Sequence, residues 1–472
     1  MSNDIQAPAA GTIPASLVLF VVSCVQFITP LMASSVGIAL PAIGKEFGAS
    51  AAQLSLVQVT YIFALAGLMI PLGRFADIHG RKLIFNLGIV MAIISTLAIG
   101  FTTSIEAFIF FRFFQGVGAA MINSTSLAIL TSVFPPERRG RALGIVAGFA
   151  YFGLAAGPSL AGAVTTQFGW RWLFYLLVPL QVIVLILTLL RLKGEWVGAK
   201  GESFGWSSSV VYLISLLLLV FGATQFNVII YAWLVALAGL AGIVLFLKGE
   251  EKKDNALLDV RLLKENRSFT LTNIATLINY GASFGVIFLF VLYLQYVKGL
   301  TAQQAGFVLM VTPCLQAIFS PIAGRWADIY SPRKVATIGM AICAVGLFGT
   351  LLMDEATSFI TIIVIMVLLG VGFGIFASPN LKVVMGCVEP RHYGTASSIS
   401  GTMRTGGILA GMVINTAVIS LFMGDEPITG ANYLEYLKSM HTCMTIFALM
   451  SVVGIGLSRF KERPQEVQLQ AG

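Results

Sequence analysis

GRFADIHGRK (residues Gly73–Lys82) and GRWADIYSPRK (residues Gly324–Lys334) are two copies of one phrase. Each copy separates two long apolar runs, and the matching aspartates, Asp77 and Asp328, are 251 residues apart. A second pair of similar segments follows in the same order, PPERRGRALGI from Pro135 and EPRHYGTASSI from Glu389. Repeated landmarks at nearly constant spacing predict that the chain contains two copies of one structural unit.

The composition of the chain places those units in a membrane. The 472 residues are 57% hydrophobic and only 11% charged, with a mean hydropathy of +0.90. Apolar runs of about 20 residues, the length that crosses a bilayer as a helix, recur along the sequence. The short alternating strands of a membrane barrel are not visible in it. The sequence therefore predicts an all-α polytopic membrane protein.

The spacing of the repeat predicts how the spans are organised. Six spans with their loops occupy residues 16–200, which is shorter than the repeat offset, so two more helices must lie between the copies. The predicted spans are 16–40, 53–73, 83–102, 106–131, 142–166, 171–191, 207–226, 229–247, 270–297, 303–325, 334–353, 357–380, 395–421 and 438–458. We expect a six-helix bundle in 1–200, two linker transmembrane helices and a cytoplasmic loop in 201–265, and a second six-helix bundle with a cytoplasmic tail in 266–472.

Charge predicts the orientation of these 14 spans. With both termini in the cytoplasm, only Lys45, Arg171, Lys298 and Lys438 of the 29 Lys and Arg residues lie in outside segments. Such a bias is typical of the cytoplasmic side of membrane proteins. It accounts for the net charge of +8 without a nucleic-acid partner. We expect a multi-pass protein of the plasma (cell inner) membrane.

The sequence does not favour an enzyme. It contains no phosphate-binding loop and no His, Cys or acidic cluster with metal-ligand spacing. The longest polar loop, 248–268, is too short for a catalytic domain. We predict no catalytic residues, no metal and no cofactor.

The repeated phrase resembles the signature of the major facilitator superfamily, through Gly73, Asp77, Gly80, Arg81 and Lys82. FRFFQGVGAA (111–120) resembles the family's fourth-span motif, and GFAYFGLAAGPSLAG (148–162) resembles its fifth-span antiporter motif. The 14-span plan resembles the drug:proton antiporter branch, typified by quaternary-ammonium exporters. The resemblance implies a secondary transporter that works by alternating access and exports amphipathic small molecules in exchange for protons.

The two phrases are candidates for a conformational gate. A carboxylate near a helix end can contact a helix N-terminus and nearby arginines in one conformation and lose that contact in another. The resemblance implies this role, whereas the plainer interpretation is a charged turn that sets topology. Ser331 and Pro332 replace the glycine in the second copy, so Asp77 is the better candidate. The predicted gate residues are Gly73, Asp77, Arg81, Lys82, Asp328 and Arg333.

Two arginines lie inside apolar runs. Arg112 and Arg404 are costly there, about 2.5–3.5 kcal/mol on insertion scales, and such residues usually face a cavity or a partner. We predict that Arg112, Gln115 and Arg404 control proton movement or attract an anion. The alternative is a structural anchor, with Arg112 bonded to Gln115 or Asn123.

The glycines of the fifth span predict a smooth helix face. Gly153, Gly157 and Gly162 would allow close helix approach, and Pro158 would bend the helix. We predict a seal on the cytoplasmic side that favours export. The alternative is ordinary small-residue packing.

The interior of the predicted spans contains cations and no carboxylates. Members of the resembled branch commonly carry an Asp in span one, several residues before an Ala-Leu-Pro ending, but the position here is Met32. Asp77 and Glu106 are acids at span edges. This balance favours a neutral or anionic amphipathic substrate.

Polar and aromatic side chains within the spans predict a mostly apolar substrate cavity with few polar anchors. Each alone is better explained by a hydrogen bond between helices. The predicted cavity residues are Gln26, Tyr61, Asn123, Asn279, Tyr280, Gln316 and Asn415.

The sequence thus predicts a monomeric exporter of small amphipathic molecules, with protons and the lipid bilayer as its other partners. One alternative is a transporter of a specific neutral or anionic metabolite without proton antiport. A second is a transport-dead membrane sensor or scaffold.

Overall fold

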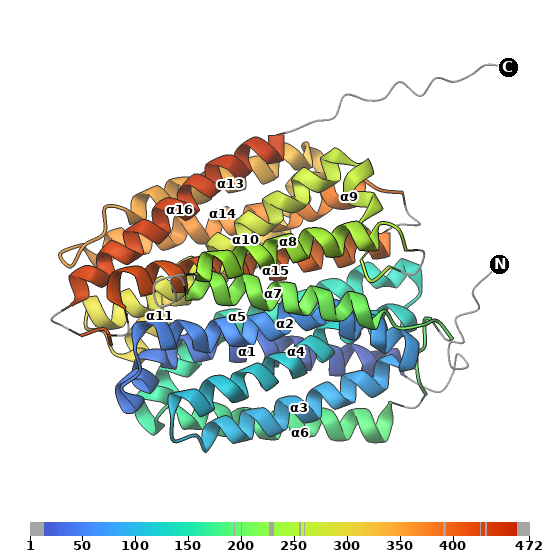
Figure 1. The fold of residues 1–472 in the computed structure, drawn as a ribbon, viewed down its shortest axis with the longest axis horizontal. Helices are drawn as coiled ribbons and strands as arrows, with labels where there is room; N and C mark the ends of the chain where they lie inside the picture. Colours follow the sequence, from blue (N-terminus) through green and yellow to red (C-terminus); the bar gives the residue numbers. More distant parts are fainter. Residues whose placement is uncertain are drawn as a thin grey trace.

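A computed structural model describes residues 14–192, 194–199, 201–225, 231–253, 256–258, 260–389, 393–424, 426–429 and 432–459. The regular structure of these residues is helical, and the long helices run side by side along one direction (Figure 1). Within this part of the chain, 14 helices are long and apolar enough to cross a membrane. The predicted fold class and span count are therefore confirmed.

The long helices form two bundles. The N-terminal bundle consists of α1 (Ala15–Phe47), α2 (Ala51–His79), α3 (Arg81–Gly100), α4 (Ile105–Val133), α5 (Pro136–Phe168) and α6 (Arg171–Arg191). The C-terminal bundle consists of α10 (Arg267–Leu292), η1 (Tyr293–Val297), α11 (Ala302–Leu309), α12 (Val311–Ile329), α13 (Pro332–Thr350), α14 (Phe359–Gly386), α15 (Tyr393–Met423) and α16 (Tyr433–Arg459).

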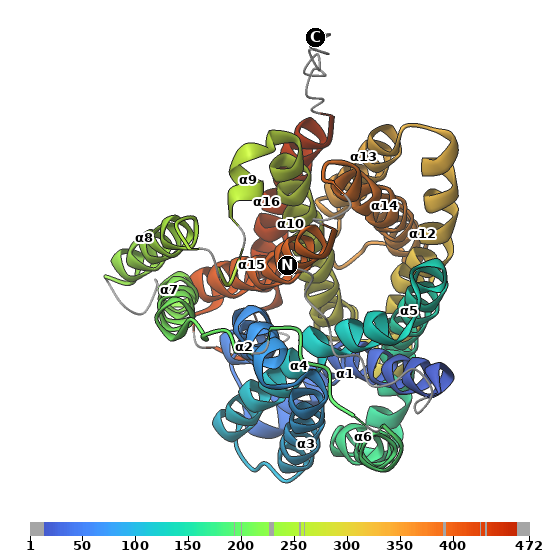
Figure 2. The ribbon, with the colours of Figure 1, turned by 90° about the vertical axis from the view of Figure 1, so that its right-hand side faces the viewer.

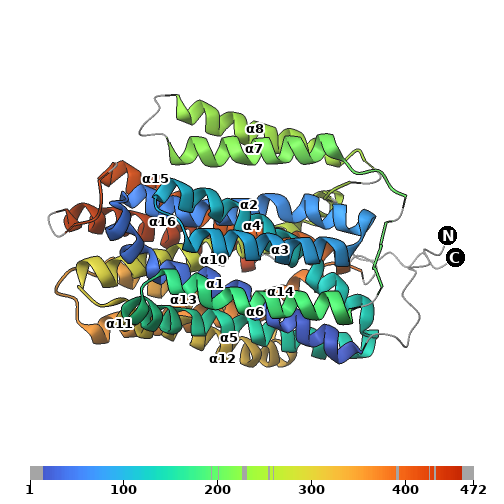
Figure 3. The ribbon, with the colours of Figure 1, turned by 90° about the horizontal axis from the view of Figure 1, so that it is seen from below.

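The linker helices α7 (Trp206–Thr224) and α8 (Ala232–Glu250) lie outside both bundles, and the short α9 (Arg261–Glu265) follows them (Figures 2 and 3). Helix α7 contacts α2 of one bundle and α15 of the other. Helix α1 begins and α16 ends at the same end of the molecule, which we call the terminus end (Figure 1). The opposite end is called the far end.

Most predicted spans agree with the helices to within a few residues. The largest difference is in α1, which continues through Pro41 to Phe47 instead of ending at residue 40. Proline is tolerated inside membrane helices because neighbouring groups can satisfy the freed backbone. The predicted start of the eighth span, residue 229, lies outside the described residues.

The tenth span is interrupted. Helix α11 ends at Leu309 and α12 begins at Val311. Pro313 explains the interruption, because it has no N–H for the carbonyl of Leu309 and its ring clashes with that carbonyl in a straight helix.

Glycines allow the two linker helices to pack closely. A methyl group placed at Gly239 of α8 would lie 2.3 Å from the backbone nitrogen of Leu219 in α7. A methyl group at Gly222 of α7 would lie equally close, 2.3 Å, to the backbone nitrogen of Ala236. Helices in lipid associate through such close contacts, since burial from water contributes nothing there.

We predict that Gly239→Leu destabilises the protein by about 1–3 kcal/mol, the usual cost of overpacking. Thermal unfolding in detergent would measure the loss. Gly249→Leu is the matched control, because a side chain at Gly249 of the same helix would meet no atom within 4 Å. Equal unfolding temperatures for the two variants would contradict the close packing.

Candidate functional site

Helix α5 uses its glycine face to contact both bundles. Methyl groups placed at Gly153 and Gly157 would lie 2.3 Å from the Phe27 carbonyl oxygen and 1.8 Å from Ser34 Oγ, both in α1. A methyl group at Gly162 would lie 2.4 Å from the Ala302 carbonyl oxygen, at the start of α11. These positions of the predicted motif are therefore the points where α5 touches other backbones.

Pro158 takes part in the contact between the bundles. A methyl group at Gly306 of α11 would lie 2.2 Å from the Pro158 carbonyl oxygen. The contact continues nearby, where Gln295 Nε2 donates to the Ile38 carbonyl oxygen at 3.1 Å. All these contacts lie toward the far end, where α5 ends and α11 begins.

The other half of α5 is open. Side chains placed at Gly144 and Gly148, near the terminus end, would meet no atom within 4 Å. Ile145 and Phe149 of the same half are exposed. The predicted seal on the cytoplasmic side stays a prediction. In this conformation the glycine face closes the far end, because Pro158 and Gly162 lie in the second half of α5.

A polar and aromatic cluster lies where α5 meets the C-terminal bundle. The hydroxyl group of Tyr151 in α5 lies near the side chain of Ser320 in α12 and in the neighbourhood of Tyr280 and Arg404. The guanidinium carbon of Arg404 in α15 lies 5.9 Å from the ring centroid of Tyr280 in α10. We call Tyr151, Tyr280, Ser320 and Arg404 the interface cluster.

Sequence reasoning found Tyr280 and Arg404 but missed Tyr151 and Ser320. Tyr151 lies within the stretch 148–162, which was interpreted only through its glycines. A tyrosine beside a glycine face, at a helix–helix contact, is the signal that could have revealed it. Ser320 lies one residue before Pro321 inside α12 and carries no comparable signal.

The remaining predicted cavity residues do not join this cluster. Gln26 Nε2 donates to Ser126 Oγ at 3.1 Å and to Asn123 Oδ1 at 3.5 Å, between α1 and α4. Tyr61 lies under Arg112. Three others contact helices of their own bundle. Asn279 donates to Cys343 Sγ, Asn415 donates to the Gly285 carbonyl oxygen, and Gln316 lies beside Gly374.

Arg112 is the centre of a buried network in the N-terminal bundle. Its side chain is fully buried, with Nη1 donating to Gln115 Oε1 at 2.5 Å and Nη2 to Gln58 Oε1 at 3.1 Å. Its Nε donates to the Val57 carbonyl oxygen at 3.3 Å, and its guanidinium lies 4.2 Å from the centroid of the Tyr61 ring. The partner Gln115 was anticipated, whereas Gln58 and Val57 were not.

A small cavity adjoins this network. It has a volume of about 30 Å³ and is lined by Met32, Tyr61, Gln115 and Gln181 among others. A cavity of this size holds no more than one or two waters. The cavity is therefore too small for an organic substrate in this conformation.

Asn123, the other predicted partner of Arg112, does not contact it. Its side chain instead donates to the Ala119 carbonyl oxygen at 2.8 Å.

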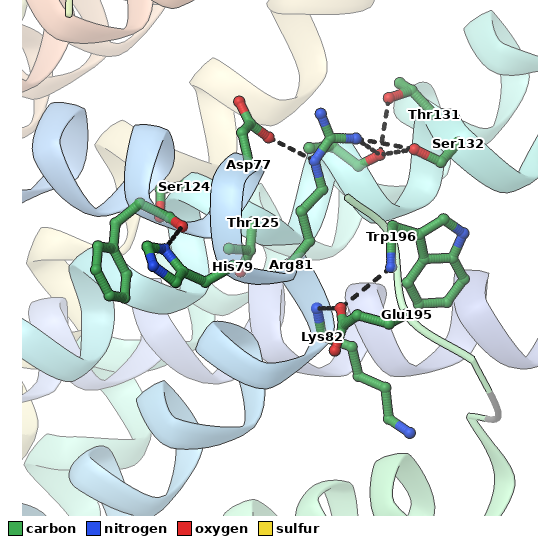
Figure 4. Close-up of polar contacts among 12 residues, drawn as sticks. Asp77, His79, Arg81, Lys82, Ser124, Thr125, Thr131, Ser132, Glu195 and Trp196 are labelled. Atoms are coloured by element: carbon green, nitrogen blue, oxygen red, sulfur yellow. Dashed lines mark hydrogen bonds and ion pairs between the residues drawn. The ribbon is translucent and has the colours of Figure 1, made fainter. Parts of the chain in front are cut away.

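The first copy of the repeated phrase forms an ion pair. Arg81 Nε donates to Asp77 Oδ1 at 2.7 Å, and Arg81 Nη1 donates to Ser132 Oγ in α4 at 3.0 Å (Figure 4). Gly73 faces Ser124 of α4, whose Cβ would be 3.5 Å from a methyl group there. The backbone N–H of Lys82 donates to Glu195 Oε1 at 2.6 Å.

The second copy forms different contacts. Asp328 pairs with Lys382 of α14, and Arg333 donates to Ser268 of α10. The Asp328 side chain is 69% exposed, against 34% for Asp77. The second copy has one more residue between its aspartate and its arginine, and Pro332 begins α13 there. Arg333 therefore follows Asp328 by five positions, whereas Arg81 follows Asp77 by four. The two predicted gates thus differ in geometry.

The interiors of the described membrane-spanning helices contain no carboxylates. Every Asp and Glu of the membrane-spanning helices lies in a first or last turn, whereas Arg112 and Arg404 lie in helix interiors. Glu106 accepts a hydrogen bond from Gln53 at the far end. Among the described residues no group of three His, Cys, Asp or Glu side chains could hold a metal.

Comparisons with known proteins agree with this architecture. The family model described as Major Facilitator Superfamily matches residues 22–249 and 272–471. A solved bacterial homologue of the human lysosomal transporter Spinster, in an inward-facing conformation, has a TM-score of 0.66 at 18% identity, over 94% of this chain and 96% of that one. A solved peptide transporter, POT, has a TM-score of 0.68 at 13% identity, over 93% and 95%.

Several relatives have names that state a transport function. The riboflavin transporter RibZ of Clostridioides difficile is 27% identical, over 92% of both chains. The multidrug resistance protein Stp of Mycobacterium tuberculosis is 28% identical, over 84% of this chain and 74% of its own. The tetracenomycin C resistance and export protein of Streptomyces glaucescens is 26% identical, over 83% and 72%.

Such proteins are transporters and not enzymes, as the sequence predicted. The family model covers both bundles and the linker helices, and the multidrug relatives match most of the chain. The chain therefore belongs to the Major Facilitator Superfamily and is a transporter of its multidrug-like branch.

Proposed function

We propose that the protein exports amphipathic small molecules across the plasma membrane by alternating access, in exchange for protons. The observation that carries the proposal is the interface cluster, which draws Tyr151 from one bundle and Tyr280, Ser320 and Arg404 from the other. A site built from both bundles changes its access when the bundles rock against one another. In this conformation α5 is closed at the far end and open at the terminus end.

The cluster supports a neutral or anionic aromatic substrate. Arg404 is exposed beside Tyr280, and none of the described carboxylates forms an ion pair with it. A guanidinium binds carboxylate and carbonyl groups through fixed donors, and tyrosine rings stack on aromatic groups. A cationic substrate would meet like charge and no compensating acid at this depth.

The proton part of the proposal rests on the antiporter-like fifth-span motif and on Asp77. Since none of the described membrane-spanning helices has a carboxylate in its interior, we place the proton carrier near a helix end. Asp77 is such a carboxylate, and it forms an ion pair with Arg81 of the same repeated phrase.

A second candidate function is the transport of one neutral or anionic metabolite without proton antiport. The observation that favours it is that the described part of the spanning helices has no carboxylate in a helix interior. The similarity to RibZ over 92% of both chains gives this candidate a substrate class, a flavin-like heterocycle.

The first test is transport by the purified protein in vesicles. We expect a pH gradient to drive an aromatic anionic dye, such as carboxyfluorescein, and neutral riboflavin, with a quaternary-ammonium dye moved more slowly. Fluorescence of the dyes reports transport directly. Movement of the cationic dye alone would contradict the charge argument, whereas movement that ignores the pH gradient would favour the second candidate.

A variant tests the cluster within the same assay. Arg404→Gln should raise KM for the anionic dye about tenfold, which corresponds to about 1.4 kcal/mol, and should leave KM for the neutral compound nearly unchanged. Arg191→Gln, at the exposed end of α6, is the matched control. Equal effects of Arg404→Gln on both compounds would contradict a role in charge selection.

We predict that Asp77→Asn lowers the transport rate about tenfold, because an amide keeps the size of the group but removes the charge that Arg81 binds. Folding should be retained, since this pair is partly exposed and such pairs contribute little to stability. Initial rates in vesicles and thermal unfolding in detergent provide the two measurements. Asp328→Asn should have a smaller effect, because Asp328 is more exposed; a larger effect would reverse our assignment of the gate.

A further inference from the structure

The segment that connects α6 to α7 is bound to the first repeated phrase. We call its described residues, 194–199 and 201–205, the strap. Trp196 is only 2% exposed and is among the largest fully enclosed side chains, although it lies outside any helix. A connector to two peripheral helices would not need such an anchor, so its contacts call for an explanation.

Helix α3 lacks a cap of its own. The residue before it, Gly80, has no side chain to accept a hydrogen bond, and its φ of 126° suits glycine. The first turn contains Arg81 and Lys82 and no acid. Cations at the positive end of a helix are unfavourable, and the free N–H groups there require acceptors.

Glu195 of the strap supplies the missing acceptors. Its carboxylate accepts a hydrogen bond from the backbone N–H of Lys82 at 2.6 Å (Figure 4). It also accepts one from the backbone N–H of Leu83 at 3.1 Å. The next residue, Trp196, accepts the N–H of Arg81 through its carbonyl oxygen at 2.9 Å. Three consecutive N–H groups of α3 are thus satisfied by a segment more than a hundred residues away.

The strap also holds the end of α2. The carbonyl oxygen of Asp77 accepts the N–H groups of Gly198 and Ala199, both at 2.9 Å. A methyl group at Gly198 would lie 3.0 Å from Nη2 of Arg81 and 3.6 Å from Asp77 Oδ1. Further along, Glu202 pairs with Arg74. The strap therefore contacts both members of the Asp77–Arg81 ion pair.

The fit between the strap and the phrase is tight. A methyl group at Gly80 would lie 2.6 Å from Cδ of Glu195. Beyond the strap, α7 packs on α2, where Gly67 faces Leu213 and Leu216. An ion pair between residues four apart is weak by itself when partly exposed. The backbone around Asp77 and Arg81 is instead held by the strap on one side and by α4 on the other.

We propose that Glu195 is a positioning residue for the gate: its carboxylate caps α3 and so sets the geometry in which Arg81 meets Asp77. The proposal rests on the alternating-access cycle proposed above and on the predicted gate role of Asp77, whose contact with nearby arginines is made in one conformation and lost in another. Loss of the cap would leave α3 folded but would let the phrase shift, which alters the balance between conformations. The linker helices, through the strap, thereby influence the gate of the N-terminal bundle.

Glu195→Gln is the variant that tests this. Glutamine retains one acceptor oxygen, but its NH₂ group would face a backbone N–H donor, so both N–H groups cannot be satisfied. Glu202→Gln is the matched control, since Glu202 lies in the same strap and pairs with Arg74 without touching α3. Glu195→Asp retains the charge and both oxygens and should restore much of the function.

Two readouts separate positioning from folding. The first is the kinetics of transport in vesicles, where we expect Vmax to fall about fivefold and KM to change less than about twofold. The second needs no substrate. The substitution Gly148→Cys, in a background with the five native cysteines replaced by alanine, reports the opening of α5 through labelling by a water-soluble maleimide. We expect Glu195→Gln to slow this labelling about threefold, as the open conformation loses population.

The outcomes are distinct. If Glu195→Gln has the same Vmax and labelling rate as Glu202→Gln, the proposal is overturned. It is also overturned if Glu195→Asp folds but is as impaired as Glu195→Gln. If Glu195→Gln fails to fold, Gly80→Ala takes its place, because the added methyl displaces the Glu195 carboxylate; unchanged labelling in that variant would also overturn it. A wild-type protein that transports none of the compounds refutes the proposed function, while labelling still tests the role of Glu195.

Discussion

The glycine face of α5 is the contact on which the arrangement of the bundles depends. In lipid the helices gain nothing from leaving water, so they associate where backbones can approach closely. Gly153 and Gly157 bring α5 against α1, and Gly162 brings the same helix against α11. One helix therefore joins its own bundle and closes the far end against the other. Larger side chains at these positions would displace the backbone of the neighbouring helix and not only its side chains.

This contact places the few polar groups of the interior. Arg112 is enclosed by Gln115, Gln58 and Tyr61, and its donors are largely used within the N-terminal bundle. Arg404 lies exposed at the interface beside Tyr280, close to Tyr151 on α5. We therefore propose that the first arginine holds a bundle together and that the second receives a ligand. The sequence could not distinguish them, since both are single cations in apolar helices.

Much of the fold was predictable because it depends on features with long-range regularity. The repeated phrase and the apolar run lengths predict two bundles, two linker helices and their approximate bounds. The orientation of individual side chains was not predictable. The spans are apolar on every side, so no periodic pattern shows which way Asn279 or Asn415 points, and both contact their own bundle.

Some contacts of the first repeated phrase were predictable from the sequence and others were not. Arg81 follows Asp77 by one helical turn, so their pairing could be anticipated from spacing. The capping of α3 by Glu195 could not, because it joins residues more than a hundred positions apart through a segment without regular structure. Tyr151 was missed for a third reason, since the glycines around it dominated the interpretation of that helix.

The central claim is that the two bundles rock so that one end closes as the other opens. Spin labels can measure it as two distances in lipid nanodiscs, one across the terminus end between positions 145 and 381 and one across the far end between 168 and 352, all exposed in this conformation. With substrate and a change of pH, the account predicts a second population in which the first distance shortens and the second lengthens. Single, unchanged distances at both ends under every condition would contradict it.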